Sequence, residues 1–166
     1  MPRKNERMLL GKPLLYWTIE CARKCNTLDA FYVSTDDWAI GLIAHSLGAS
    51  IIRRPDELAT DDTPTVEVLR HALSLHPAQY IVCLQPTSPF RLPQDVDECV
   101  MLSRKNGETV ISYGPDGKNG AVYVCRAEWL KEFNFTDTHV RYSMPAERSI
   151  DIDTMEDLMK AEAQLG

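Results

Sequence analysis

Residues 80–91 read YIVCLQPTSPFR, and this stretch gives the clearest indication of the fold. Its first five residues are apolar throughout, which is typical of a central strand with both faces covered. Amide, hydroxyl and guanidinium groups follow at once, in a loop stiffened by Pro86 and Pro89. In open α/β sheets, ligands bind beyond the carboxyl ends of the strands. The stretch therefore predicts a buried strand that leads into a binding loop.

On both sides of this stretch, strand-like segments alternate with segments of helical periodicity. Helical periodicity is present in residues 13–24, 37–47, 63–75, 93–104 and 155–165. Strand-like runs are residues 30–34, 50–53, 80–84, 109–113 and 121–125. This alternation predicts an α/β fold, a three-layer sandwich with a mostly parallel central sheet. We expect a single domain that spans residues 1–166.

The composition limits the classes of binding partner and the cellular compartment that we expect. The 166 residues carry a net charge of -6, which argues against nucleic acid, because phosphate backbones need a broad basic surface. The sequence contains no apolar run long enough for a membrane span or a signal peptide, so we expect a cytoplasmic protein that binds no membrane. The 5 cysteines lie in apolar settings without a CxxC pair, which is typical of reduced thiols.

The loop after the apolar run offers groups for a polar ligand. Gln85, Thr87 and Ser88 have the hydrogen-bonding groups that suit a polyhydroxylated molecule, and Arg91 suits an anion. The alternative is an ordinary connection between a strand and a helix, in which the two hydroxyls bond the local backbone. The loop residues alone leave both interpretations open.

The stretch SIDIDT, just before the last expected helix, contains a pair of carboxylates. In an extended segment, Asp151 and Asp153 point to the same side, whereas Ile150 and Ile152 point to the core. Two convergent carboxylates favour a cation between them, and Mg²⁺ prefers such oxygen ligands together with substrate phosphates. The alternative is that Asp153 or Thr154 caps the helix, and both interpretations can hold at once.

Basic residues gather at the start of the sequence. Arg3 and Lys4 would neutralise phosphates, and Asn5 would bind a base or a ribose. Lys12 adds a cation just before the first expected helix, whose N-terminus attracts anions. The alternative is a solvated tail. Arg54 precedes a polar loop and would line a base pocket or belong to a solvated turn.

Taken in order, these motifs resemble the acylneuraminate cytidylyltransferase family, the CMP-sialic acid synthetases. The motifs are PRKN, GKPLLYWTIE, VSTDD, RRPDELATDDTPT, LQPTSPFR, NGAVYV and ERSIDIDT. They extend over most of the chain, and LQPTSPFR is the most specific of them. The resemblance implies a nucleotide-diphospho-sugar transferase-like fold that is usually dimeric. It also implies an enzyme that joins CTP to a nine-carbon acidic sugar and releases pyrophosphate.

The resemblance implies a role for each polar residue at these motifs. The catalytic residues would be Arg3, Lys4, Asp151 and Asp153. The nucleotide would be bound by Arg3, Lys4, Asn5, Arg54 and Thr65. The sugar would be bound by Gln85, Thr87, Ser88 and Arg91. The cofactor would be Mg²⁺ held by Asp151 and Asp153, and the protein would be a homodimer.

Two departures from the family pattern keep other functions open. The pattern begins with a strand and a glycine-rich loop upstream of PRKN, and its connection before NGAVYV is longer than residues 113–119. We therefore expect a domain that lacks the first strand and its loop. One alternative function is an inactive remnant that binds a nucleotide or a sugar. The other is a cytidylyltransferase for 3-deoxy-octulosonic acid.

Overall fold

The computed structural model of the chain describes residues 4–60, 62–131 and 138–165. Arg3, which the sequence predicts to bind the nucleotide, lies outside the described residues. The helices are α1 (Leu14–Lys24), α2 (Trp38–Ser46), α3 (Thr65–Leu75), α4 (Pro93–Asn106) and α5 (Met155–Leu165). The strands are β1 (Met8–Leu9), β2 (Lys12–Pro13), β3 (Tyr32–Thr35), β4 (Ser50–Arg53), β5 (Tyr80–Cys83), β6 (Thr109–Gly114), β7 (Gly117–Arg126) and β8 (His139–Ser143). The 3₁₀ helices are η1 (Lys4–Glu6), η2 (Asp56–Leu58), η3 (Ala127–Lys131) and η4 (Ala146–Arg148).

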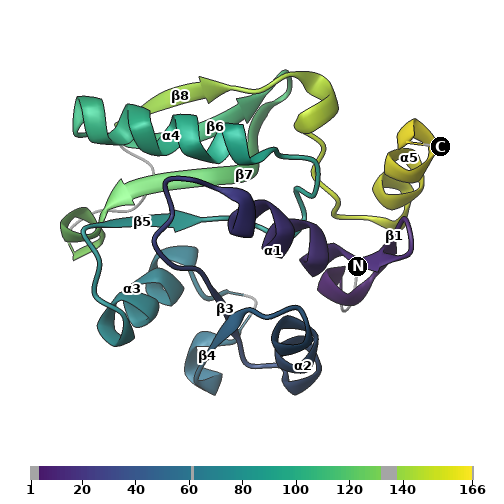
Figure 1. Ribbon diagram of the computed structural model, residues 1–166, viewed down its shortest axis with the longest axis horizontal. Helices are drawn as coiled ribbons and strands as arrows, with labels where there is room; N and C mark the ends of the chain where they lie inside the picture. The colour runs from purple at the N-terminus through teal and green to yellow at the C-terminus, as the bar shows by residue number, and fades with distance from the viewer. Residues whose placement is uncertain (1–3, 61, 132–137, 166) are drawn as a thin grey trace.

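The main sheet is mixed in direction. Among the described residues its strand order is β5-β7-β6-β8, and β3 and β4 form a separate parallel pair (Figure 1). β7 runs antiparallel to both β5 and β6, whereas β8 runs parallel to β6. The predicted α/β class is confirmed, but the prediction of a mostly parallel sheet is wrong in this part. A two-residue turn at Pro115 and Asp116 brings β7 back beside β6, which makes the pair antiparallel.

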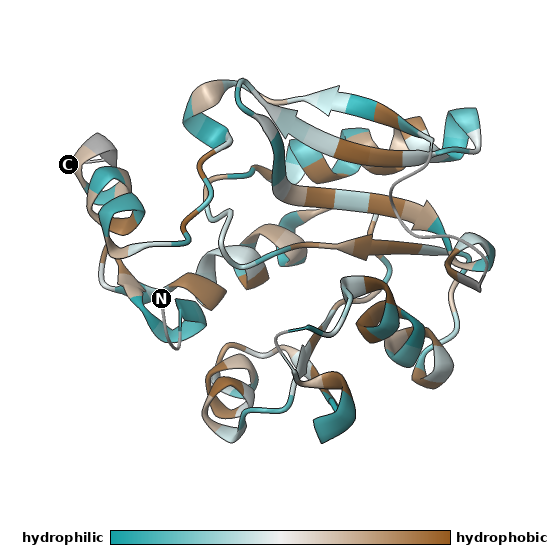
Figure 2. Ribbon diagram, turned by 180° about the vertical axis from the view of Figure 1, so that it is seen from behind, coloured by the Kyte–Doolittle hydropathy of each residue, from teal (hydrophilic) through white to brown (hydrophobic). Residues whose placement is uncertain are grey.

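Helices cover both faces of the main sheet, as a three-layer sandwich requires. On one face, Val96 and Val100 of α4 and Cys21 of α1 pack against Val110 and Val122. On the other face, α3 packs against β5 and β7. Figure 2 shows the apolar residues of these two strands as brown bands in the middle of the molecule. Removing such surface from water is the main source of the fold's stability.

The strand β5 differs from its sequence-based prediction in one respect. Its two faces are covered as expected, since Val82 packs toward α4 while Ile81 and Cys83 pack toward α3. However, it pairs with β7 alone and ends the strand order, so within the described residues it is an edge strand rather than a central one. All four of its residues are consequently only half-buried.

The strand β8 has no counterpart among the predicted strands. His139 lies in a stretch that reads as a loop, yet it opens β8 and pairs in parallel register with Thr109. The pattern HVRYS has charged and apolar side chains interspersed, and its residues are half-buried or exposed. This mixture is typical of an edge strand that faces solvent, for which hydrophobicity gives a weak signal.

Local sequence signals set the ends of the helices. Asp37 begins α2 by accepting hydrogen bonds from the backbone N–H groups of Ala39 and Ile40 at 2.6 and 3.2 Å. Gly107 ends α4 in the left-handed region, at a φ of 70°. No helix in the described ranges has both the length and the apolar character needed to cross a membrane.

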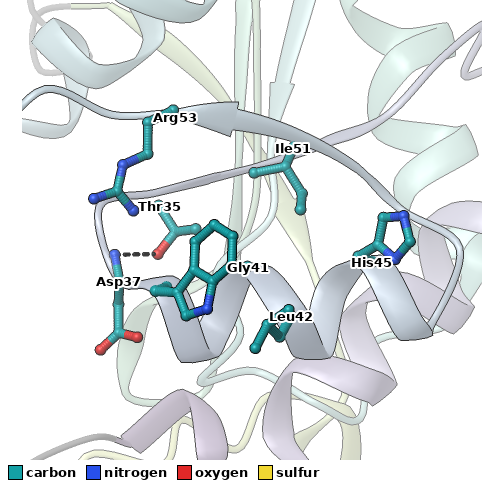
Figure 3. Close-up of a pocket in the computed structure, with 8 residues that line it drawn as sticks. Thr35, Asp37, Gly41, Leu42, His45, Ile51 and Arg53 are labelled. Carbon is teal, nitrogen blue, oxygen red and sulfur yellow. Dashed lines mark hydrogen bonds between the residues drawn. The ribbon is translucent and has the colours of Figure 1, made fainter.

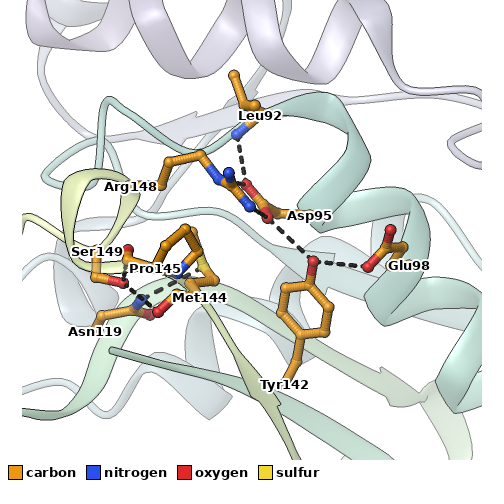
Figure 4. Close-up of polar contacts among 9 residues, drawn as sticks. All are labelled: Leu92, Asp95, Glu98, Asn119, Tyr142, Met144, Pro145, Arg148 and Ser149. Atoms are coloured by element: carbon orange, nitrogen blue, oxygen red, sulfur yellow. Dashed lines mark hydrogen bonds and ion pairs between the residues drawn. The ribbon is translucent and has the colours of Figure 1, made fainter. Parts of the chain in front are cut away.

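A buried carboxylate ties η4 to α4. Asp95 is fully buried and accepts hydrogen bonds from Nε and Nη2 of Arg148 at 3.1 and 3.0 Å (Figure 4). It also accepts from the backbone N–H of Leu92 at 2.8 Å and from the hydroxyl of Tyr142 at 3.1 Å. These bonds satisfy the buried charge and fix the segment that leads to Asp151.

We expect Arg148→Ala to lower the free energy of unfolding by about 2–3 kcal/mol, since it leaves the Asp95 carboxylate buried without its cation. Urea denaturation followed by circular dichroism measures the change. Glu98→Gln is the control, because Glu98 is an exposed member of the same cluster and should change stability by less than about 0.5 kcal/mol. Equal effects of the two substitutions would contradict the assigned role of Asp95.

Candidate active site

Three distant segments meet at the carboxyl end of β5. A Cβ atom added at Gly120 of β7 would overlap Oε1 of Gln85 and lie 3.8 Å from Oδ2 of Asp151. The backbone N–H of Ile152 donates to the carbonyl of Thr87 at 2.8 Å, which holds the acidic stretch against the loop. The structure thus places the polar loop and the carboxylate pair, which the sequence singles out separately, side by side.

The bulge in β7 explains why Gly120 reaches the loop. The register between β6 and β7 shifts between Ile111 and Tyr113, so β7 carries extra residues at that point. Gly120 adopts a φ of 67°, which favours glycine, and the absent side chain makes room for Gln85. Asn119 is buried and accepts hydrogen bonds from Ser112 Oγ and the backbone N–H of Ala121 at 2.6 and 3.2 Å.

The carboxylate of Asp151 is the unusual group of the cluster. Its Oδ1 atom is buried and has no hydrogen-bond partner. Burial raises the pKa of Asp151, and the hydroxyl of Thr87 opposes this effect. The charge of Asp153 raises this pKa further, whereas the charge of Lys4 lowers it. A buried oxygen without a partner is unfavourable unless a ligand completes it.

The opening stretch lies against this carboxylate pair. Lys4 of η1 forms an ion pair with Asp153, with 2.8 Å between Nζ and Oδ1. Asn5 is half-buried in the same 3₁₀ helix. Lys4 therefore contributes its positive charge to the carboxylate cluster.

The capping alternative holds for Thr154 rather than for Asp153. Thr154 Oγ1 accepts from the backbone N–H of Asp157 at 3.1 Å, and the Asp157 carboxylate accepts from the backbone N–H of Thr154 at 2.8 Å. This reciprocal pair satisfies the start of α5. The carboxylate of Asp153 is not needed for the cap and pairs with Lys4 instead.

The donor set at Asp151 and Asp153 fits a divalent cation that also binds substrate. Within the described ranges there is no group of three or more His, Cys, Asp or Glu residues that would hold a metal ion by themselves. Mg²⁺ is commonly held by one or two carboxylates and completes its coordination with water and phosphate oxygens. The unpartnered Oδ1 of Asp151 supplies the kind of ligand atom that such an ion requires.

Two of the predicted sugar-binding residues have other partners. Arg91 is only 3% exposed, and its Nη1 donates to the carbonyls of Gln85 and Ala121 at 2.9 and 2.8 Å. Its Nη2 donates to Thr18 Oγ1. Ser88 is fully buried and donates to the carbonyl of Asn119 at 2.9 Å. In the structure both side chains therefore lie in the interior and hold the loop in place, which differs from the predicted direct contact with a sugar.

A second polar group lies where β3 and β4 end. Arg54 pairs with Asp36 at 2.7 Å, and its backbone N–H donates to the carbonyl of Thr35 at 2.9 Å. The hydrogen bond from Arg54 keeps the pKa of Asp36 below its ordinary value. Thr65 is exposed at the start of α3. In the described part of the chain, no hydrogen bond or ion pair of Arg54 reaches the carboxylate cluster, so the predicted residues fall into two groups.

Gly120 and Asn119 are absent from the residues that the sequence predicts to line the site. Both belong to the motif NGAVYV, but a glycine inside a strand pattern indicates a bulge without indicating which side chain it faces. The Asn-Gly pair at the start of an apolar run is the signal that would have pointed to them.

Comparison with known proteins shows which family the chain is similar to. Residues 1–157 match the family model described as Cytidylyltransferase. An N-acylneuraminate cytidylyltransferase of Escherichia coli O18:K1:H7 is 31% identical over 192 residues, which cover 90% of this chain and 45% of that protein. A CMP-N,N'-diacetyllegionaminic acid synthase of Legionella pneumophila is 34% identical over 121 residues, which cover 69% of this chain and 52% of that protein.

The fold also matches a solved structure. A CMP:2-keto-3-deoxy-manno-octonic acid synthetase complexed with CTP has a TM-score of 0.84 at 15% identity, with 99% of this chain and 92% of that chain covered. At this identity the likeness shows the fold alone. The chain spans about half the length of the curated relatives it matches. The alignment with the Escherichia coli protein, at 192 positions, is longer than the 166 residues of this chain, so that protein has residues without a counterpart here.

We expect Gly120→Ala to lower the free energy of unfolding by about 1 kcal/mol more than Gly11→Ala. Both glycines lie in the left-handed region, at φ values of 67° and 73°, but only at Gly120 would the new methyl group meet the Gln85 side chain, since nothing lies within 4 Å at Gly11. Urea denaturation of the two variants gives the difference, and the NMR signals of the Gln85 side-chain amide report its displacement. Identical losses of stability, with an unmoved Gln85 amide, would refute the contact.

Proposed function

The chain belongs to the cytidylyltransferase family, and we propose that it joins CTP to a nine-carbon acidic sugar, giving a CMP-sugar and pyrophosphate. The observation that carries this proposal is the unpartnered buried oxygen of Asp151, set beside Asp153, Lys4 and Gln85. The names of the Escherichia coli and Legionella pneumophila relatives support an N-acylneuraminate or a related nonulosonic acid as the sugar.

The proposed reaction asks for alignment and charge neutralisation rather than covalent catalysis. The anomeric hydroxyl of the sugar attacks the α-phosphorus of CTP, and a new P–O bond forms while the bond to pyrophosphate breaks. The hydroxyl proton leaves to solvent or to a base during the attack. Such a displacement depends on holding both reactants in line and on stabilising negative charge on the phosphate oxygens.

Asp151 and Asp153 would hold Mg²⁺ in this proposal. When bound, the ion would supply positive charge that offsets the negative charge of the CTP phosphates. Burial raises the pKa of Asp151, so a proton competes for this carboxylate at a higher pH than for an ordinary aspartate. Lys4 offsets part of the local negative charge when the phosphates are absent and is placed to neutralise them when they bind.

The remaining polar residues are assigned by their positions. Gln85 would hydrogen-bond the sugar, and Thr87 lies beside Asp151. Ser88 and Arg91 would support the sugar site by holding the loop in place. Arg54 follows β4 and Thr65 begins α3, and both would contact the nucleotide. Arg3 would contact the CTP phosphates together with Lys4, and Asn5 would contact the nucleotide. We also propose that the protein acts as a homodimer. Its free cysteines support action in the cytoplasm, where thiols stay reduced.

Pyrophosphate release tests this proposal directly. The chain is incubated with Mg²⁺ and each of CTP, ATP, GTP and UTP, against a panel of nine-carbon acidic sugars and 3-deoxy-octulosonic acid. We expect release only with CTP, the metal and a nine-carbon sugar. Asp151→Asn should slow the reaction about a hundredfold or more, because it removes a metal ligand. The apo fold should keep its stability or gain some, since the substitution removes a buried carboxylate whose charged form is unfavourable.

Asp116→Asn is the matched control, since Asp116 is exposed in the turn between β6 and β7. It should leave the rate unchanged. Equal rates for both variants would remove the metal assignment. Release with 3-deoxy-octulosonic acid alone would favour the related cytidylyltransferase, and CTP binding without release for any sugar would favour an inactive binding protein.

A further inference from the structure

The guanidinium of Arg91 lies in the interior of the protein. Charged groups elsewhere meet water: Asp37 and Arg53, for example, are exposed and line an open hollow of about 690 Å³ beside α2 (Figure 3). Arg91, in contrast, is only 3% exposed, and its Nη atoms donate to two backbone carbonyls and one hydroxyl. These oxygens are neutral, and a buried cation is unfavourable unless an anion accompanies it.

The groups that surround Arg91 are thiols rather than carboxylates. In the part of the chain that the structure describes, Arg91 forms no ion pair with Asp or Glu, and its buried Nε atom has no hydrogen-bond partner. The charges that act on it belong to the thiols of Cys21, Cys83 and Cys25. Burial raises the pKa of Cys83 to about 11, so that thiol keeps its proton at neutral pH. Another of these thiols would have to supply the missing anion.

Cys21 is the thiol best placed to supply that anion. Thr18, which accepts a hydrogen bond from Arg91, lies three residues before Cys21, so both side chains share a face of α1. A hydrogen bond with the Cys25 thiol lowers the pKa of Cys21, and the charge of Arg91 lowers it further, although burial and the charge of Asp95 act in the opposite direction. The same hydrogen bond raises the pKa of Cys25, which therefore keeps its proton.

We propose that Cys21 is a thiolate that pairs with Arg91 in the protein interior, and that a peroxide oxidises this chain at Cys21. The thiolate sulfur attacks one oxygen of hydrogen peroxide, an S–O bond forms, the O–O bond breaks and hydroxide leaves. The sulfur is oxidised to a sulfenic acid, and the peroxide accepts the electron pair. The step would leave Arg91, which holds the loop at Gln85, without its counter-charge.

Cys25 is placed to react with that sulfenic acid. It is the C-cap of α1, and its thiol donates to the carbonyl of Cys21 at 3.2 Å. Residues four apart in a helix have Cα atoms about 6 Å apart, which is within the range that disulfides span. The Cys25 sulfur would bond to the Cys21 sulfur, and the sulfenic oxygen would leave as water with the proton of the thiol.

Titration of the whole chain tests the charge of Cys21, independently of any enzymatic activity. Thiolates absorb in the ultraviolet, and we expect one group to ionise below pH of about 8.5, the ordinary value for cysteine. Cys21→Ser should remove this step. Cys99→Ser should keep it, because Cys99 is buried in the same apolar cluster and burial raises its pKa. A titration without such a step, or a step that persists in Cys21→Ser, would overturn the proposal. If Cys21→Ser does not fold, the NMR shift of the Cys21 Cβ atom in the unsubstituted chain distinguishes a thiolate from a thiol.

Peptide mapping tests the reaction with peroxide. The chain is treated with limiting hydrogen peroxide, unfolded in iodoacetamide and cut with trypsin, which separates Cys21 from Cys25 at Arg23 and Lys24. We expect the Cys21 thiol to be lost about tenfold faster than the Cys99 thiol, and the peptides of Cys21 and Cys25 to be joined by a disulfide. In Cys21→Ser the Cys25 thiol should persist. Equal rates for Cys21 and Cys99, or a Cys25 thiol that is lost as fast in Cys21→Ser as in the unsubstituted chain, would each overturn the proposal.

Discussion

The arrangement of the candidate site depends on one buried guanidinium. Arg91 reaches the carbonyl of Gln85 after β5, the carbonyl of Ala121 in β7 and the hydroxyl of Thr18 in α1. Burying a cation is unfavourable, and its desolvation lowers the pKa of Arg91, so the oxygen atoms around it must offset that penalty. In return, the loop, the sheet and the first helix are fixed to one another. The position of Gln85, and with it the meeting of the loop and Asp151, follows from this contact.

Much of the fold could be predicted from the sequence, because hydrophobic periodicity reports which face of a segment is buried. Each predicted helix and strand is present in the structure; the ends of β4 and α5 agree with the prediction, and the others are shifted by a few residues. Strand direction and neighbours could not be predicted in the same way, since they depend on contacts between distant residues. Within the described residues β5 pairs with β7 on one side and with no strand on the other, and no pattern within residues 80–84 encodes these neighbours. The edge strand β8 was missed because its exposed residues are mixed in polarity.

The site could be predicted only in part, because residue types show which chemical groups are present but not where their side chains point. Polar residue types show which groups are available for chemistry, and Gln85, Asp151 and Asp153 do lie together with Lys4. The same residue types also form hydrogen bonds in the protein interior. Nothing in QPTSPFR indicates that Arg91 and Ser88 are buried while Gln85 remains half-exposed. Gly120 contributes to the site because it lacks a side chain and so leaves room for Gln85. This role cannot be predicted from the sequence, which does not show that Gln85 lies against Gly120.

The pairing of Lys4 with Asp153 joins residues that are 149 positions apart. The surrounding apolar cluster joins the same two regions, since Leu9 and Leu14 pack against Ile152, Leu158 and Ala161. Figure 1 shows α5 beside β1. An exposed ion pair alone is too weak to close so long a loop, so the cluster must provide most of the free energy. When α5 detaches, Leu9 and the carboxylate pair lose their support together. We therefore infer that η1, β1 and α5 form one cooperative unit, which would open without unfolding the main sheet and would take the acidic half of the site with it.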